Sequence, residues 1–301
     1  MIRSEISIEM QLLNEIKLQF GRATGLFRLL AINIGVFLVI TLARTFLFLF
    51  TGESAGIDWL VGKLSLPASP ELLLYQPWSL LTYMFLHADL LHILFNMLIL
   101  YWTGRLFTEY LGNDKLWATY VLGGLVGGFL YLVSFNLFPA FSAAKQYSFL
   151  LGASAGVIAV LVAVATLLPD YIVHLLLIGP VRLKYVAIIS ILLYFISIPL
   201  GNAGGHIAHL GGALFGYLMI VRLRSGSDLT SWLTGLGKRK KAKMKVVSRQ
   251  VQRGGTEDTY HDQNAASQEA IDRILDKINR SGFDSLTKQE KEILYKASGK
   301  N

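Results

Sequence analysis

Long apolar segments constrain the fold of this chain more than any other feature. Six stretches come close to the ~20 apolar residues that a helix needs to cross a lipid bilayer. They cover residues 27–50, 81–104, 116–138, 149–168, 183–200 and 205–222. Composition agrees, because 53% of the residues are hydrophobic and 16% are charged, whereas soluble domains contain about 25% charged residues. The sequence therefore predicts an all-α polytopic membrane protein with six transmembrane helices.

The distribution of basic residues predicts the orientation of these helices. Short cytoplasmic loops are enriched in lysine and arginine. With the N-terminus in the cytoplasm, the cytoplasmic segments before the tail contain Arg3, Lys17, Arg22, Arg28, Arg105, Lys115, Arg182, Lys184, Arg222 and Arg224, and the loops on the other side contain Lys63 and Lys145. The first segment begins too far from Met1 for a cleaved signal peptide. We expect a multi-pass protein of the cell inner (plasma) membrane with both termini cytoplasmic.

The net charge of +8 is concentrated in one polar region. Residues 225–301 contain 15 basic and 10 acidic side chains, which accounts for five of the eight excess positive charges. The basic run at 238–245 directly follows the last apolar segment, where it either sets topology or contacts anionic lipids. We therefore predict no nucleic-acid partner. The chain has no cysteine, which excludes disulfides, thiolate metal sites and a cysteine nucleophile.

The chain divides into four parts by composition. We expect a cytoplasmic N-terminal segment at 1–26, a membrane domain at 27–224, a basic flexible linker at 225–267 and a small cytoplasmic helical hairpin at 268–301. In the last part, Ile271, Ile274, Leu275 and Ile278 recur at helical spacing. Thr287 and Glu290 form the pattern of a capping box, which predicts a second short helix after it.

One short motif suggests a nucleophilic serine. Residues 152–156, GASAG, match G-x-S-x-G, which in soluble hydrolases places a serine on a sharp turn between a strand and a helix. Here we expect no strand before the serine, only a loop and then an apolar helix. The match to that elbow is therefore coincidental, and the role of Ser154 depends on its surroundings.

Polar side chains in three of the apolar segments lie at one predicted depth. His87, His92 and Asn96 fall in the outer half of 81–104, Ser154 falls near the start of 149–168, and His206 and His209 fall in the first turns of 205–222. These three segments run in the same direction, from outside to inside. Ionisable and polar groups are costly inside a bilayer and mark functional sites. Their convergence near the outer face favours chemistry.

Each of these residues also has a structural interpretation. A single buried asparagine or serine commonly bonds to a neighbouring helix, and small residues at four-residue spacing allow helices to pack closely. Gly152 with Gly156, and Gly212 with Gly216, have that spacing. Taken one residue at a time, the structural interpretation is the stronger one.

Two chemistries fit the cluster. One is a metal site built from imidazole ligands of His87, His92, His206 and His209, although no helper Asp or Glu for a catalytic metal is apparent. The other is acyl transfer, which needs a nucleophile, a base and donors for the developing oxyanion. Ser154, one histidine of the last segment, and His92 with Asn96 supply all three, so we favour the second.

These motifs resemble those of the rhomboid intramembrane serine proteases, over residues of about 27–224, and especially the bacterial six-span form. Three patterns in this order give the resemblance: His87-(x)4-His92-(x)3-Asn96, then Gly152-Ala153-Ser154, then Ala208-His209-Leu210-Gly211-Gly212-(x)3-Gly216. The C-terminal hairpin also resembles a short tail found on some rhomboids of Bacteroidetes-type bacteria.

The resemblance implies a role for each matching residue. Ser154 would be the nucleophile and His209 the general base of a dyad without an acid. The oxyanion hole would consist of His92, Asn96 and the backbone N–H of Ser154. His87 would be a structural hydrogen-bonding residue, and Gly212 and Gly216 would let the last span approach the fourth. His206 matches no catalytic role.

The resemblance also implies the reaction and its partners. The activity would be intramembrane endopeptidase cleavage of other membrane proteins in the lipid bilayer, at helix-destabilised transmembrane segments, with no metal and no cofactor. The alternatives are a non-proteolytic relative that binds transmembrane helices of clients, and a metal-dependent membrane enzyme or transporter.

Two positions depart from the family pattern. Ala155 follows the serine where glycine is usual, so its methyl group is expected to narrow the site. Ile158 stands where many members have a tyrosine that stacks on the catalytic histidine. We expect the orientation of His209 to be less secure as a result.

Overall fold

A computed structural model describes residues 24–175, 178–236, 271–278, 280 and 285–298. The chain forms two separate units, residues 1–240 and 241–301, and each is described by itself. The predicted N-terminal segment, up to residue 23, and residues 237–267 of the predicted basic linker lie outside the described residues.

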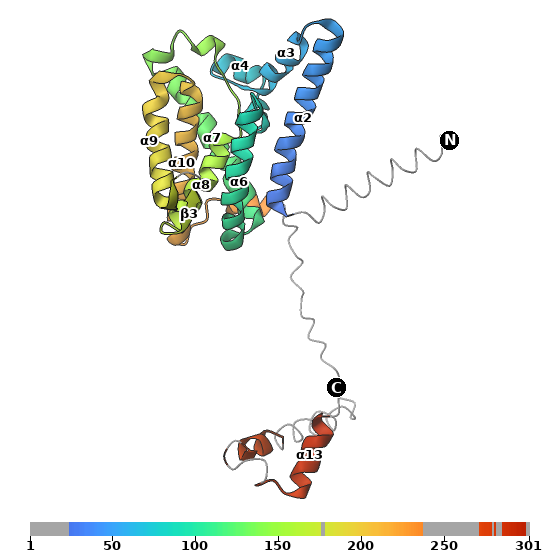
Figure 1. The fold of residues 1–301 in the computed structure, drawn as a ribbon. Coiled ribbons are helices and arrows are strands. Elements are labelled where there is room, and N and C mark those ends of the chain that lie inside the picture. Colours follow the sequence, from blue (N-terminus) through green and yellow to red (C-terminus); the bar gives the residue numbers. More distant parts are fainter. Residues whose placement is uncertain (1–23, 176–177, 237–270, 279, 281–284, 299–301) are drawn as a thin grey trace, which may run out of the picture. The chain divides into compact units, whose positions relative to one another are not determined.

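The first unit is a bundle of long helices (Figure 1). Among the described residues, five helices are long and apolar enough to cross a membrane: α2 (Gly25–Thr51), α6 (Leu90–Leu111), α7 (Asn113–Leu137), α9 (Leu183–Ser197, extended to Leu200 by the short helix η4) and α10 (Ala203–Arg224). The predicted all-α polytopic class is confirmed. The predicted fourth span is a shorter apolar helix, α8 (Ser154–Leu167), so five long helices and one short one replace six full-length spans.

Helix α8 lies inside the bundle, where it packs against α6, α7, α9 and α10. Eleven of its fourteen residues, Ala155 to Ala165, are buried. A helix of this length extends about 21 Å, whereas the hydrocarbon core of a bilayer is about 30 Å thick. A helix enclosed by its neighbours need not reach both surfaces, because protein surrounds its ends.

The second span begins later than predicted, at Leu90 rather than near residue 81. The preceding residues form the short helices α5 (Ser79–Thr82) and η1 (Tyr83–Phe85). Asp89, which falls inside the predicted span, is the N-cap of α6, and its carboxylate accepts the backbone N–H of His92 at 2.8 Å. This cap stabilises the helix start and places His92 in its first turn.

The fourth span also begins later than predicted, at Ser154 rather than near residue 149. Phe149–Leu150 form a short strand, β2, which pairs antiparallel with β1 (Leu66–Pro67). The expectation that no strand precedes the serine was therefore wrong. Gly152 then turns the chain with φ 137°, a conformation that L side chains rarely adopt. Its N–H donates to the carbonyl of Tyr83 at 2.9 Å.

Shorter elements connect these helices. Between α2 and α6 the chain forms α3 (Ala55–Leu64) and α4 (Pro70–Tyr75), and the chain between α7 and β2 includes η2 (Pro139–Phe141) and η3 (Lys145–Tyr147). A second hairpin, β3 (Ile172–Leu175) with β4 (Gly179–Arg182), joins α8 to α9, and α11 (Ser231–Leu236) follows α10. Arg44, in the C-terminal half of α2, forms an ion pair with Asp58 of α3 at 2.7 Å.

The described residues of the second unit include two short helices, residues 271–278 and α13 (Lys288–Ser298). The predicted capping box is confirmed, because the Thr287 N–H donates to Glu290 and the Glu290 N–H donates to Thr287 Oγ1. Lys277 of the first helix also bonds to Glu290 at 2.9 Å. The hydrogen bond from the Thr287 N–H, and to a smaller extent that from the Lys277 ammonium, lowers the pKa of Glu290 to about 2.

Candidate active site

One cavity of about 1180 Å³ contains four of the polar residues that the sequence singles out. His92 and Asn96 reach it from α6, Ser154 from the start of α8, and His209 from α10. These positions are far apart in the chain, and the packing of α8 against α6 and α10 brings them together.

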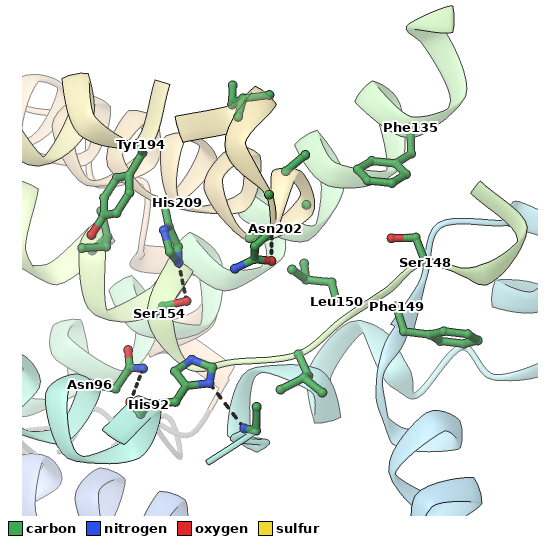
Figure 2. Close-up of a pocket in the computed structure, with 18 of the residues that line it drawn as sticks. His92, Asn96, Phe135, Ser148, Phe149, Leu150, Ser154, Tyr194, Asn202 and His209 are labelled. Atoms are coloured by element: carbon green, nitrogen blue, oxygen red, sulfur yellow. Dashed lines mark hydrogen bonds between the residues drawn. The ribbon is translucent and has the colours of Figure 1, made fainter. Parts of the chain in front are cut away.

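Ser154 and His209 are in direct contact (Figure 2). The distance from Ser154 Oγ to His209 Nε2 is 2.6 Å, within the normal range of a hydrogen bond from a hydroxyl group. A nucleophile and a base at this separation have the geometry for proton transfer from the hydroxyl to the ring.

The N-terminus of α8 creates a favourable site for negative charge. Ser154 is the first residue of the helix, and its N-cap residue, Ala153, forms no side-chain capping bond. The first N–H groups of a helix have no partner within the helix, and the helix dipole favours negative charge at this end. The backbone N–H of Ser154 is therefore available to an anion beside its own side chain.

His92 has a defined tautomer in this geometry. The backbone N–H of Ala88 points at His92 Nδ1 over 3.3 Å, so Nδ1 is the acceptor and the proton of the neutral ring is on Nε2. A Cβ added to Gly152 would lie 3.1 Å from His92 Nε2 and 3.4 Å from Ser154 Oγ. The missing side chain of Gly152 leaves a space between a donor and the nucleophile.

Asn96 lies one turn after His92 on the same helix and is buried. Its amide NH₂ donates one hydrogen bond to the His92 carbonyl at 2.8 Å. An amide NH₂ has two N–H donors, so one remains for a group in the cavity. Figure 2 shows His92 and Asn96 on the side of Ser154 opposite His209.

The two glycines of the last span occur where α10 meets α8. A Cβ on Gly212 would overlap the carbonyl oxygen of Ala155, and one on Gly216 would overlap that of Ala159. Only glycine allows the two backbones to approach this closely, which brings His209 within reach of Ser154.

We expect Gly212→Ala to separate α10 from α8. The added methyl group should lower the free energy of unfolding by about 1–3 kcal/mol, as overpacking does. Any cleavage activity should fall by up to about 10²-fold, because His209 moves away from Ser154. Thermal unfolding in detergent and cleavage of a single-span substrate measure the two effects.

Gly35→Ala is a matched control for that change. Gly35 is within α2, and a Cβ there meets no atom within 4 Å. Alanine should leave cleavage unchanged and raise stability by about 0.5–1 kcal/mol. Equal stability and activity in Gly212→Ala and the wild type would show that close approach of the helices is not required.

The other two histidines lie beside the pair rather than in it. His87 precedes α6, and neither of its ring nitrogens has a hydrogen-bond partner within the described part of the chain. Its ring instead packs by edge against His92, with 5.1 Å between centroids, and against Phe37. His87 therefore contacts His92 by packing, and its role as a structural hydrogen-bonding residue stays a prediction. His206 lies against Tyr194 and His209.

The two departures from the family pattern have different outcomes. The expectation that Ala155 narrows the site was wrong: its methyl group faces Gly127 of α7 and it is not among the cavity residues. Each residue advances about 100° around a helix, so the neighbour of Ser154 points elsewhere. Ile158 does line the cavity. An aromatic ring against His209 is nevertheless present, supplied by Tyr194 of α9.

Tyr194 was not among the residues predicted from the sequence. It stands within the apolar run ILLYFIS of the fifth span, and a tyrosine in such a run gives no catalytic signal. Its only unusual feature is a hydroxyl group among apolar neighbours.

The metal alternative has little support from the arrangement of side chains. Within the described residues, no group of three or more His, Asp or Glu is placed to hold a metal ion. The ring of His87 contacts that of His92, whereas the ring of His206 contacts that of His209 on α10.

The fold and the site together define a polytopic membrane protein with a serine–histidine pair inside its helical bundle. Residues 75–226, about half of the chain, match the Rhomboid domain. The chain therefore belongs to the rhomboid family, whose members are in general intramembrane serine proteases. Residues 256–300 match a family of unknown function, DUF6576. The bacterial six-span form and the origin of the tail stay predictions.

Two curated relatives are similar to about half of the chain. RHOMBOID-like protein 12, mitochondrial, of Arabidopsis thaliana is 31% identical over 157 residues, which are 49% of this chain and 47% of the relative. Rhomboid-like protease 3 of Toxoplasma gondii is 25% identical over 162 residues, which are 52% and 56% of the two chains. The chain thus spans about half the length of the curated relatives it matches.

Proposed function

We propose that this protein is a serine endopeptidase that cleaves transmembrane segments of other membrane proteins through the dyad of Ser154 and His209. The observation that supports this most is the 2.6 Å contact between Ser154 Oγ and His209 Nε2, in a cavity that also contains His92 and Asn96.

The reaction needs only side chains of this cavity and water. Ser154 Oγ attacks the carbonyl carbon of the scissile peptide bond while its proton passes to His209 Nε2. The oxyanion that forms accepts hydrogen bonds from the Ser154 N–H, His92 Nε2–H and the Asn96 amide. His209 then gives the proton to the leaving amine as the C–N bond breaks. Water, deprotonated by His209, hydrolyses the ester and regenerates Ser154.

The depth of the site sets a requirement on the substrate. A peptide carbonyl in a helix is bonded within that helix and enclosed by side chains, so a helical segment must unwind before it can reach Ser154. Glycine and other helix-weakening residues lower the cost of unwinding. We therefore infer that the preferred substrates have transmembrane segments that are locally destabilised.

The positive-inside distribution of basic residues supports an orientation with both termini in the cytoplasm, as we propose for a multi-pass protein of the cell inner membrane. Arg105, near the end of α6, and Arg222 and Arg224, at the end of α10, then face the cytoplasm. Ser154 lies at the N-terminus of α8 and His209 lies near the N-terminus of α10, at the end away from Arg222 and Arg224. In this orientation the catalytic cavity lies near the outer face.

Labelling with a fluorescent fluorophosphonate tests the proposed nucleophile. The full chain in lipid vesicles should form one covalent adduct, in which Ser154 Oγ bonds to phosphorus and fluoride leaves. Peptide mass analysis locates the adduct. Treatment with a chelator should leave labelling unchanged, since the proposed reaction needs no metal.

Ser190→Ala is the matched control. Ser190 is a serine of α9 whose hydroxyl donates to the Val186 carbonyl, outside the cavity. This variant should label as the wild type does, and Ser154→Ala should not label. A folded wild-type protein that neither labels nor cleaves would contradict the proposal and favour a non-proteolytic protein that binds transmembrane helices.

A further inference from the structure

The base of the proposed dyad lacks the usual means of orientation. In a Ser-His-Asp triad, the aspartate bonds to His Nδ1–H and holds the ring in place. Here His209 Nδ1 is buried and has no hydrogen-bond partner among the described residues. The hydrogen bond to Ser154 at Nε2 is a single polar contact and does not by itself fix the orientation of the ring.

Tyr194 contacts this ring from a different helix. Its ring centroid lies 4.4 Å from that of His209, with an angle of 60° between the planes. Aromatic rings prefer such tilted arrangements at short separation. Tyr194 also lines the catalytic cavity, and Figure 2 shows it directly beside His209.

His206 completes a small aromatic cluster. It stacks on Tyr194 with 6.1 Å between centroids and 29° between planes. It also lies one turn before His209 on α10, at 6.1 Å and 81°. Tyr194 of α9 is therefore in ring contact with two histidines of α10, and this gives its ring a defined position.

We propose that Tyr194 is a positioning residue, which holds the imidazole of His209 in line with Ser154 through ring contact, with His206 stacked on Tyr194. This inference rests on the proposed function, because positioning matters only if His209 acts as a base. Under this inference, Tyr194 makes the aromatic contact with His209 that Ile158, an aliphatic residue, cannot make.

Three substitutions of Tyr194 distinguish the effect of its ring from that of its hydroxyl group. Tyr194→Phe keeps the ring, Tyr194→Leu keeps much of the volume, and Tyr194→Ala removes both. Loss of the ring should slow fluorophosphonate labelling of Ser154 and lower kcat by about two- to tenfold. KM should stay near the wild-type value, since the contact is to the base. Tyr194→Phe, which keeps the ring, should have the wild-type labelling rate and the wild-type kcat.

Phe195→Ala is the matched control. Phe195 is the next residue of α9, is 64% exposed and does not line the cavity. Its loss should leave labelling and kcat unchanged. Thermal unfolding in detergent shows whether each variant is folded, and Tyr194→Leu replaces Tyr194→Ala if the smaller side chain unfolds the protein.

The outcomes distinguish this inference from the proposed function. A wild type that neither labels nor cleaves overturns the proposed function itself. A wild type that labels and cleaves, with Tyr194→Leu or Tyr194→Ala equally fast, overturns the positioning role alone. A Phe variant as slow as the Leu variant would assign the effect to the hydroxyl, and an equally slow Phe195→Ala would assign it to a shift of α9. Either result contradicts the inference.

Discussion

Ser154→Ala and His209→Ala should each lower kcat for a single-span substrate in reconstituted vesicles by at least about 10⁴-fold. The expectation follows from the 2.6 Å contact between the two side chains, since neither can replace the other. Without the serine there is no acyl intermediate, and without the histidine the hydroxyl keeps its proton. Cleavage is measured from the rate at which the N-terminal fragment appears.

The effects of the two substitutions on kcat should not be additive. Nucleophile and base act as one unit, so the double variant should be no slower than either single variant. Ser190→Ala and His174→Ala are the matched controls, because both residues lie outside the cavity, and His174 is an exposed residue of the β3–β4 hairpin. Substantial cleavage by a folded Ser154→Ala or His209→Ala variant would refute the dyad.

His92→Ala and Asn96→Ala should each lower kcat by about 10²–10³-fold, the usual cost of one oxyanion donor. His92 has its proton on Nε2 because Nδ1 accepts the Ala88 N–H, and Asn96 retains one amide donor after bonding to the His92 carbonyl. Both donors matter most when the carbonyl oxygen becomes negative. KM should therefore change little, which a full kinetic analysis in vesicles can test.

Asn113→Ala is the control for these two variants. Asn113 is an exposed residue at the start of α7 and should have wild-type kcat. If His92→Ala and Asn96→Ala instead raised KM at unchanged kcat, the two side chains would bind the ground state of the substrate. That result would remove them from the oxyanion hole.

The candidate site residues could be singled out from the sequence because polar groups stand out in apolar segments. Ser154, His209, His92 and Asn96 all lie in or beside stretches that are otherwise apolar, and their convergence at one predicted depth, more than any single residue, indicated a site. The starts of the second and fourth helices were not predictable from hydropathy. Asp89 caps α6 and the pairing of β2 with β1 delays α8, and neither interaction changes the apolar character of the segment.

The sequence by itself determined the membrane class, the family and the identity of the candidate nucleophile and base, because these depend on composition and on spacing along the chain. Only the tertiary structure decided which ring orients His209, which way Ala155 points and how His87 contacts the site. These contacts join different helices, so they depend on how closely α8, α9 and α10 pack and on the rotation of each helix about its axis. Spacing within one helix does not fix either quantity.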